Sequence, residues 1–335
     1  MNDARVTLAH GSGGMAMTRL IRSLFLETFA DPELARLEDA ARLQLAEGRP
    51  AFTTDAFVVD PPFFPGGDIG RLAVCGTVND LAVAGARPAY LSCAFILEEG
   101  LALADLARVA RSMKTSADEA GVRIVCGDTK VVPRGAADRL FVTTAGVGVI
   151  PPGIELGGDR IRPGDRILVS GPLGDHGAAV LDARGELGLT HDIASDCQPL
   201  NRLTAALLAA VPVRAMRDPT RGGLAAVLNE WAGACGREIV VDEAAVPVRE
   251  AVQGLCELLG LDPFYLACEG RLVAAVPEAA ATDALACLRA DPAGREAALV
   301  GEVSEAGTAQ VVLRTVFGGQ RLLDRPEGEP LPRIC

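Results

Sequence analysis

Residues 101–120 have the sequence Leu-Ala-Leu-Ala-Asp-Leu-Ala-Arg-Val-Ala-Arg-Ser-Met-Lys-Thr-Ser-Ala-Asp-Glu-Ala, and this stretch decides the fold class. Its apolar side chains recur at helical spacing, which predicts an amphipathic helix. Strand-like segments flank it at 89–97 and 122–126. Further outward, the pattern predicts a helix at 68–86 and strands at 51–59 and 140–149. Strands that alternate with helices favour a layered α/β or α+β fold.

A break near 151–153, Pro-Pro-Gly, is followed by a Gly- and Pro-rich segment at 157–164 and marks a domain boundary. We therefore expect an N-terminal domain at 1–150, a C-terminal domain at 151–317 and an extended, mobile tail at 318–335, where periodicity stops. The second domain is predicted to hold a turn at 171–177, helices at 199–210, 222–235, 248–259 and 278–289, and strands at 165–170, 238–242, 271–276, 297–303 and 309–314.

Composition excludes several classes of protein. The 335 residues carry a formal net charge of −12, which argues against a nucleic-acid partner because phosphate backbones are bound by basic faces. We find no signal peptide and no uncharged apolar run long enough to cross a bilayer, so we expect a cytoplasmic protein without a membrane partner. The nine cysteines include no Cys-x-x-Cys pair, which disfavours a disulfide framework or a zinc site.

Acidic residues beside turns and apolar segments suggest a site. They are Asp39, Asp55 inside a predicted strand, Asp80 after Asn79 in a predicted helix, and Asp128 after a predicted buried strand. A carboxylate in an apolar element is costly unless it is paired or bound to a cation. A single one is usually a cap or an ion pair, whereas four in one domain also fit a shared Mg²⁺–phosphate site. Both interpretations stay open on spacing alone.

Other short motifs are weaker. Lys130, two residues after Asp128, is either a solvated lysine or a cation for phosphate or a developing oxyanion. The Gly-rich segment 10–14 is a turn or a phosphate-binding loop, and 221–223 begins a predicted helix that could bind an anion. Glu269 lies at a predicted strand edge, where a carboxylate is ordinarily a surface residue.

The chain ends in Pro-Arg-Ile-Cys (332–335) after a proline-rich segment. Cys335 is either an incidental exposed thiol or the end of a swinging carrier arm that takes up a group at one site and delivers it to another. Twelve extended residues could reach about 40 Å. Arg333 would favour the thiolate form, and the α-carboxylate would oppose it.

Together these motifs resemble the HypE-type hydrogenase-maturation proteins, a family of carbamoyl dehydratases. The matching segments run in order along essentially the whole chain: His-Gly-Ser-Gly-Gly (10–14), Asp-Ala-Ala (39–41), Thr-Thr-Asp (53–55), Phe-Phe-Pro-Gly-Gly-Asp-Ile-Gly (63–70), Gly-Thr-Val-Asn-Asp-Leu-Ala (76–82), Gly-Asp-Thr-Lys-Val-Val (127–132), Gly-Asp-His-Gly (174–177), Arg-Asp-Pro-Thr-Arg-Gly-Gly (217–223) and the terminal Pro-Arg-Ile-Cys.

The resemblance implies a two-domain fold like that of aminoimidazole-ribonucleotide synthetase (PurM-like). It also implies a homodimer formed through an eight-stranded β-barrel of the N-terminal domains, with ATP in the cleft between domains. A carbamoyltransferase, HypF, would load the terminal thiol. An iron-carrying HypC–HypD complex would receive the product as the cyanide ligand of the [NiFe] centre.

The resemblance also assigns roles to residues. Asp39, Asp55, Asp80 and Asp128 would form the Mg²⁺–ATP set, with Asn79 and Thr129 beside the nucleotide and Asp39, Asp80 and Asp128 on the metal. Lys130 would lie near the activated oxygen, Glu269 would be the base and Cys335 the acceptor. The chemistry is ATP-dependent dehydration of an S-carboxamide to an S-cyanide.

Alternatives within the same fold are selenophosphate synthetase, thiamine-phosphate kinase and the purine synthetase. None of these requires a terminal Pro-Arg-Ile-Cys. A non-catalytic ATP-binding scaffold would use the acidic cluster only to order the cleft. A thiol-redox relay through Cys335 is disfavoured because no resolving cysteine lies nearby.

Overall fold

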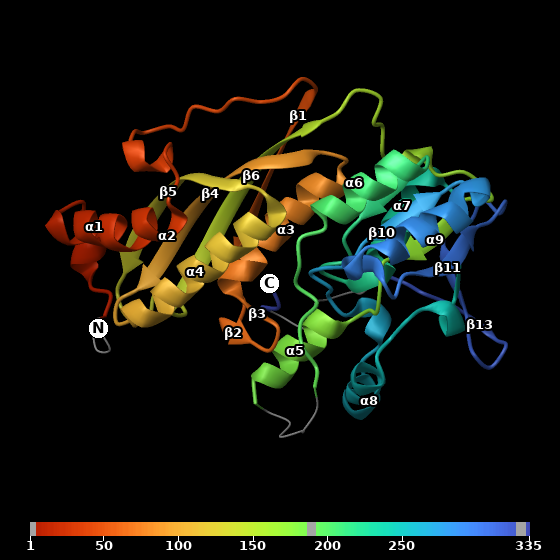
Figure 1. The fold of residues 1–335 in the computed structure, drawn as a ribbon. Coiled ribbons are helices and arrows are strands. Elements are labelled where there is room, and N and C mark those ends of the chain that lie inside the picture. The colour runs from red at the N-terminus through yellow and green to blue at the C-terminus, as the bar shows by residue number, and fades with distance from the viewer. Residues whose placement is uncertain (1–4, 186–191, 326–332) are drawn as a thin grey trace.

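The computed structural model describes residues 5–185, 192–325 and 333–335. Its first half contains a four-stranded sheet in the order β1-β6-β4-β5 (Figure 1). Strand β6 is antiparallel to β1 and β4, whereas β4 and β5 are parallel and joined by a helix. The strands are β1 (Arg49–Phe57), β4 (Arg87–Glu98), β5 (Arg123–Val132) and β6 (Leu140–Ile150).

Two predicted helices cover one face of this sheet. Helix α3 (Ile69–Val83) is apolar nearly all round and therefore fully buried, and Asp68 caps it by accepting hydrogen bonds from the backbone of Gly70 and Arg71. Helix α4 (Leu103–Ala120) buries its apolar stripe against α3 and exposes the opposite side. Near the N-terminus, α1 (Met15–Leu20), a π-helical segment (Ile21–Leu26) and α2 (Glu27–Phe29) pack on the sheet, where Phe25 stacks on Phe95.

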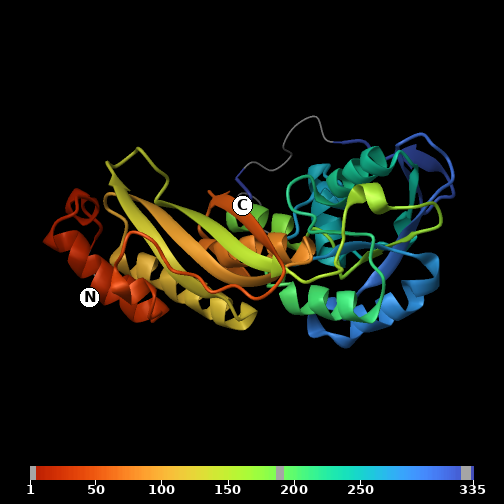
Figure 2. The ribbon, with the colours of Figure 1, turned by 90° about the horizontal axis from the view of Figure 1, so that it is seen from above.

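The opposite face of this sheet carries exposed apolar side chains. Phe52 on β1 is 71% exposed and Ile96 on β4 is 41% exposed. Because side chains alternate along a strand, Thr54 and Ala56 lie on the same face as Phe52 and are also exposed. Figure 2 shows α4 lying along one face of this sheet. This face thus exposes a mixture of apolar and polar side chains, and the single chain does not bury it in a core.

The second half is built on a seven-stranded sheet in the order β13-β12-β9-β11-β7-β10-β8. Helix α7 (Gly223–Cys235) packs on one face through Trp231, whereas α6 (Asn201–Ala210) and α9 (Ala281–Ala290) pack on the other. The strands are β7 (Arg166–Val169), β8 (Ala215–Arg217), β9 (Ile239–Asp242), β10 (Val273–Val276), β11 (Ala298–Val303), β12 (Val311–Arg314) and β13 (Gln320–Leu322).

The two halves share part of one core. Helix α5 (Asp175–Ala183) and helix α8 (Glu250–Leu259) belong to the second half of the sequence, yet Val180 and Leu255 pack in the hydrophobic core of the first. The predicted turn at 171–177 is wrong beyond Gly174, because α5 begins at Asp175. Gly174 has a left-handed backbone that the turn requires, and the small apolar residues after it complete a short buried helix.

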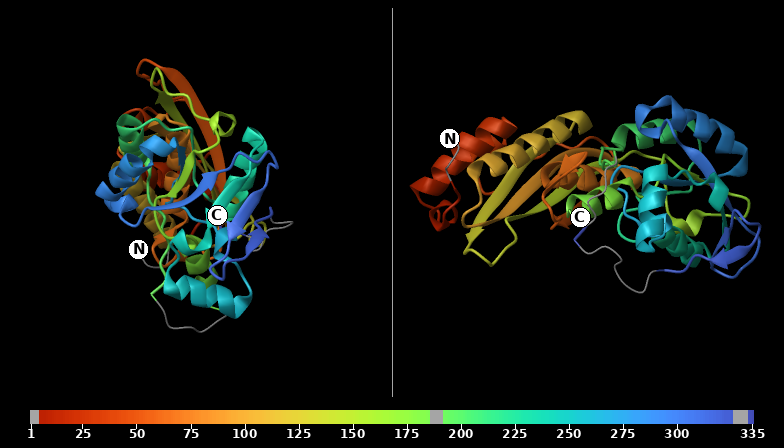
Figure 3. Two further views of the ribbon diagram at one scale, coloured as in Figure 1. Left: turned by 90° about the vertical axis from the view of Figure 1, so that its right-hand side faces the viewer. Right: turned by 90° about the horizontal axis from the view of Figure 1, so that it is seen from below.

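The end of the chain differs from the predicted mobile tail. Strand β13 falls within 318–325 and pairs with β12 through a turn at Gly318, and Leu323 is fully buried. Residues 326–332 lie outside the described part of the chain. Residues 333–335 pack on the first core at the middle of the molecule, beside α5 (Figures 1 and 3). In the described ranges, no helix is both long and apolar enough to span a membrane.

Candidate active site

A cleft of about 760 Å³ opens between the two sheets. The first half contributes β1 and the end of α3, and the second contributes β8, α7 and the short helix Gly158–Arg160. This volume suits a nucleotide-sized ligand. Polar groups converge on the cleft from both halves: Thr53, Asp80, Arg217, Asp218, Thr220 and Glu230.

Two predicted aspartates meet at one side of the cleft. Thr53 and Asp55 project from the same face of β1 because they are two residues apart. Thr77 and Asp80 share a face of α3 because they are three residues apart. The Thr53 hydroxyl donates to Asp80 (2.7 Å) and the Thr77 hydroxyl donates to Asp55 (3.0 Å). Burial, and then the charge of Asp80, raises the pKa of Asp55.

Two more carboxyl groups approach from the second half. Asp218 follows β8, and burial followed by the charges of Asp80 and Asp55 raises its pKa from 3.8 to about 7. Glu269 is buried, and its pKa is raised well above 4.5 by burial and then by Asp218, Asp196 and Asp55. Its backbone N–H donates to Asp196 (3.0 Å). The carboxyl groups of Asp55, Asp218 and Glu269 therefore hold protons more strongly than exposed ones, and a bound cation would stabilise their charged forms.

The start of helix α7 lies near this acidic group, because Thr220 lines the same cleft. Helix α7 begins at Gly223 after Gly222, and both glycines have left-handed backbone conformations. A helix N-terminus carries unpaired N–H groups and partial positive charge. The neighbouring Arg221 lowers the pKa of Asp55, which indicates that its charge reaches the same region. Carboxylates near a helix N-terminus are elements that can hold a phosphate chain with its cation.

Asn79 has a structural place in this chain, and its predicted contact with the nucleotide stays a prediction. Its amide donates to the backbone oxygens of Gln198 (3.1 Å) and Glu269 (3.1 Å), and its oxygen accepts from the backbone of Leu200 (2.8 Å). Both amide hydrogens are used, and the side chain is fully buried. Asn79 therefore ties α3 to the second half of the chain and fixes the segment that carries Glu269.

Asp128, Thr129 and Lys130 lie inside β5, not after a strand that ends at 126 as predicted. The strand continues because Gly127 allows the close approach of the Cys93 carbonyl on β4, where a Cβ would lie 2.3 Å from that oxygen. Asp128 and Lys130 form an exposed ion pair (2.9 Å) that lowers the pKa of Asp128. In the sheet order, β5 is the edge strand opposite β1.

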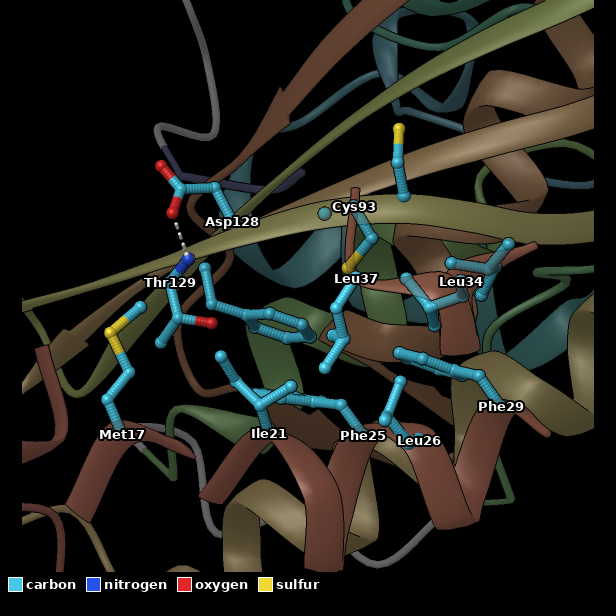
Figure 4. A pocket seen from close by; sticks show the side chains of 14 residues that line it. Met17, Ile21, Phe25, Leu26, Phe29, Leu34, Leu37, Cys93, Asp128 and Thr129 are labelled. Atoms are coloured by element: carbon cyan, nitrogen blue, oxygen red, sulfur yellow. Dashed lines mark hydrogen bonds between the residues drawn. The ribbon is translucent and has the colours of Figure 1, made fainter. Parts of the chain in front are cut away.

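Thr129 points to the other face of β5 and lines a small apolar pocket of about 110 Å³. Figure 4 shows Ile21, Phe25 and Phe29 reaching this pocket from the N-terminal helices, whereas Asp128 points away from them. The Gly-rich segment belongs to this region, because Gly11 packs against Val131 of β5. It does not reach the cleft.

The predicted metal ligands are not assembled by one chain. Asp80 lines the cleft, Asp128 lies on β5 and Asp39 is exposed in a bend. Across residues 5–185, 192–325 and 333–335, no three His, Cys, Asp or Glu side chains are grouped closely enough to hold a metal ion by themselves. A cation with few protein ligands, completed by phosphate and water, stays compatible with Asp80 and Asp218.

Cys335 lies at the end of β1. Its carbonyl accepts from the backbone N–H of Val58 (3.0 Å), three residues after Asp55, and the residue is partly buried against the first core. The neighbouring Phe57 ring and the Glu269 carboxylate both face Gly76, where a Cβ would lie 3.0 Å and 3.9 Å from them. Gly76 therefore leaves room for the contact between the end of β1 and the acidic cluster. Lys130 lies on the far strand of the sheet and shares none of these contacts.

Comparison with known proteins gives the family. Residues 37–150 match the model of the AIR synthase related protein N-terminal domain, and residues 162–314 match that of the C-terminal domain. The carbamoyl dehydratase HypE of Rhodobacter capsulatus is 58% identical over 341 residues, covering 100% of this chain and 99% of the relative. The chain belongs to the HypE family of carbamoyl dehydratases.

Solved structures of HypE proteins agree with this assignment. A hydrogenase maturation protein HypE in complex with ATP superposes with a TM-score of 0.94 at 53% identity, covering 98% of this chain and 99% of that one. A HypE–HypF complex contains a chain that matches with a TM-score of 0.80 at 44% identity, covering 92% of this chain and 99% of that one. The predicted two-domain, AIR-synthase-like fold is confirmed.

Sequence analysis missed Asp218 and Asp196 as members of the site. Asp218 stands in the Arg-Asp-Pro-Thr-Arg-Gly-Gly segment, which was noted for Arg221 and the helix start. The available signal was an aspartate between a short apolar strand and a Gly-rich helix start. Asp196 had no such signal, because its role depends on contacts with Arg271 (3.3 Å) and the backbone of Glu269 across the fold.

Asp218→Asn should change how the stability of this HypE-family chain depends on pH. The pKa of Asp218 is about 7 when folded and near 4 when unfolded, so the folded state binds the proton more strongly. Its contribution to stability is present below about pH 4 and is lost as pH rises through 7. The variant should therefore gain roughly 1–4 kcal/mol relative to wild type between pH 4 and 8, measured by urea unfolding. Parallel curves for the two proteins would contradict this.

Proposed function

We propose that this chain uses ATP to dehydrate a carbamoyl group carried on the thiol of Cys335, and so produces the S-cyanide that supplies the cyanide ligand of a [NiFe] hydrogenase. The observation that carries the proposal is the docking of Cys335 on Val58, at the end of the strand that bears Thr53 and Asp55. Family membership supports the reaction class. The backbone of the terminal cysteine thus docks just after the strand that lines the acidic cleft.

The reaction needs phosphoryl transfer followed by elimination. In S–C(=O)–NH₂ the carbonyl oxygen is a poor leaving group until it accepts the γ-phosphoryl of ATP, with ADP as the other product. The N–H protons are then removed, the carbon–oxygen bond breaks, and phosphate leaves as S–C≡N forms. Catalysis of this kind rests on positioning and on stabilising charge.

The residues of the cleft fit these steps. Asp80 and Asp218 line the cleft and are the carboxylates we assign to Mg²⁺, which when bound would neutralise charge on the phosphates. Arg221 and the start of α7 would bind phosphate oxygens. Glu269, buried behind them with a raised pKa, suits the proton acceptor, because a general base is most effective when its pKa approaches the working pH.

The loss of one thiol should abolish the reaction without removing ATP binding. Wild type, Cys335→Ser and the control Cys287→Ser would be incubated with a HypF-type carbamoyltransferase, carbamoyl phosphate and Mg-ATP, and weighed by intact-mass spectrometry. We expect wild type and Cys287→Ser to gain one carbamoyl group that loses one water only with ATP present. Cys287 is a suitable control because it is a partly exposed cysteine on α9.

Two outcomes would overturn the proposal. One is an ATP-dependent loss of water in Cys335→Ser. The other is continued ATP consumption by wild type with no adduct on Cys335, which would favour a scaffold or another activity of the same fold.

We further propose that the chain works as a homodimer joined through the exposed face of the first sheet. Phe52 and Ile96 leave an apolar patch on that face, and such patches on soluble proteins mark interfaces. In the described chain β1 and β5 end the sheet without a further partner strand, so two four-stranded sheets could close into an eight-stranded barrel. Asp128 and Lys130 lie on this face, and we therefore assign their roles to the dimer.

A charge on this face should separate the copies. Ile96→Glu places a carboxylate in the proposed interface and should convert a dimer to a monomer in sedimentation velocity experiments. Leu258→Glu is the matched control, because Leu258 is 62% exposed on α8, away from this sheet. A monomeric wild type, or dimers of equal strength in all three proteins, would contradict the proposal.

Partners follow from the same chemistry. A HypF-type enzyme would load Cys335, and a HypC–HypD iron complex would accept the cyanide group. The described structure joins none of the nine cysteines in a disulfide, which fits a reducing compartment. We therefore propose the cytoplasm as the site of action. Both exchanges require Cys335 to leave its position at the end of β1.

A further inference from the structure

The last three residues are held by their backbone. The carbonyl of Arg333 accepts hydrogen bonds from the backbone N–H of Asp60 (3.3 Å) and from the guanidinium group of Arg184 (3.1 Å). The carbonyl of Cys335 accepts one from the backbone N–H of Val58. Between them, the carbonyl of Ile334 lies 2.8 Å from Nε2 of His176. Three successive carbonyls are therefore bound by groups from the end of β1 and from α5 and its C-terminal cap.

We propose that His176 is a positioning residue: its hydrogen bond to the Ile334 carbonyl holds the terminal backbone in place and so sets where the Cys335 thiol is presented. We call this hydrogen bond the latch. The inference rests on the proposed function for its catalytic consequence. Its structural part, the control of how often the thiol is released, does not depend on the reaction.

The hydrogen bonds of His176 determine its tautomer. A carbonyl oxygen only accepts, so Nε2 carries the hydrogen and donates to Ile334. Nδ1 then accepts from the Ser195 hydroxyl (2.8 Å), whose oxygen in turn accepts from the N–H of Cys197 (3.1 Å). The neutral ring is thus used on both sides. Burial, which lowers its pKa to about 4, keeps it neutral at physiological pH.

His176 is tightly enclosed by the fold. Its side chain is fully buried, and its ring meets the ring of Phe64 edge-on with centroids 5.4 Å apart. Ile334 is 2% exposed and inserts into the first core. Release of the tail would therefore expose an isoleucine and leave a buried N–H of His176 without its partner.

Side chains add selectivity for the terminal sequence. Arg333 donates through Nε to the carbonyl of Val58 (3.2 Å) and pairs with Asp138, while Arg184 bridges the carbonyls of Asp60 and Arg333. The structure thus accounts for the last three residues: the arginine pairs with the acidic rim, the isoleucine fills the core and the cysteine carries the chemistry.

The latch controls how often the tail is docked and how often it is released. In the docked position Cys335 lies at the end of β1, whose earlier residues line the cleft, whereas loading and delivery require release. A weaker latch should therefore expose Cys335 more often, leave loading unimpaired and slow the dehydration of a preloaded group.

Replacing the latch tests this directly. His176→Leu removes the donor, and His176→Gln is the matched control because its amide can donate in place of Nε2. Alkylation of Cys335 by iodoacetamide would be followed by peptide mass, together with single-turnover dehydration after loading. We expect His176→Leu to be alkylated roughly tenfold faster and to dehydrate more slowly, and His176→Gln to restore much of both. ATP affinity and the thermal unfolding midpoint would serve as folding controls.

A second measurement covers the case in which His176→Leu fails to fold. The imidazole ¹⁵N signals of His176 would be compared between the full chain and a chain that lacks residues 333–335. The proposal expects a change at Nε2, and an unchanged signal would overturn it, as would unchanged alkylation and dehydration in a folded His176→Leu. If wild type is never carbamoylated, the proposed function fails, but the alkylation comparison still decides the latch.

Discussion

The site depends on the mutual repulsion of carboxyl groups, two half-buried and two buried, that gather at the seam, the cleft between the two sheets. Asp55 and Asp80 come from the first half, and Asp218 and Glu269 from the second. Like charges in a partly dry cleft cannot all ionise unless a cation or positive group joins them. The seam is therefore suited to the metal-bound phosphate chain of a nucleotide. The raised pKa values of its carboxyl groups reflect how much a bound cation would stabilise their charged forms.

The repulsion is tolerated because the two halves are tied together close to it. Asn79 of the first half bonds the backbone of Gln198 and Glu269 across the seam. Asp196 and Arg271 fix the segment that carries Glu269. Helix α5 continues this linkage: Asp175 pairs with Arg271 and Arg249 of the second half, while His176 holds the tail against the first. Helix α5 thus contacts both the docked tail and the second half of the chain.

Periodicity predicted much of the fold. Residues 101–120 and 140–149 correspond to α4 and β6 within a few residues, because amphipathic and alternating patterns depend on local geometry. Helix α5 was missed because a Gly-Asp-His-Gly segment looks like a turn when its buried partners are unknown. Strand β5 was cut short because Gly127 and Asp128 are poor strand formers, and only contact with β4 explains them.

Sequence reasoning identified acidic residues but not their grouping. Asp55 and Asp80 come together through the packing of α3 on β1, whereas Asp128 and Lys130 lie on the opposite edge strand. Spacing along a chain does not specify the order of strands in a sheet, so one predicted site became two regions. Asp218 joins the first region only because β8 is brought to the seam by the second sheet.

The central claim is that the oxygen of the carbamoyl group leaves as phosphate. The most direct test is to load Cys335 with a carbamoyl group that carries a heavy oxygen isotope, add Mg-ATP in ordinary water, and measure the isotope in the phosphate released. The account predicts that the label moves into phosphate as the cysteine becomes the S-cyanide. Unlabelled phosphate, released while the carbamoyl group stays intact on Cys335, would contradict it.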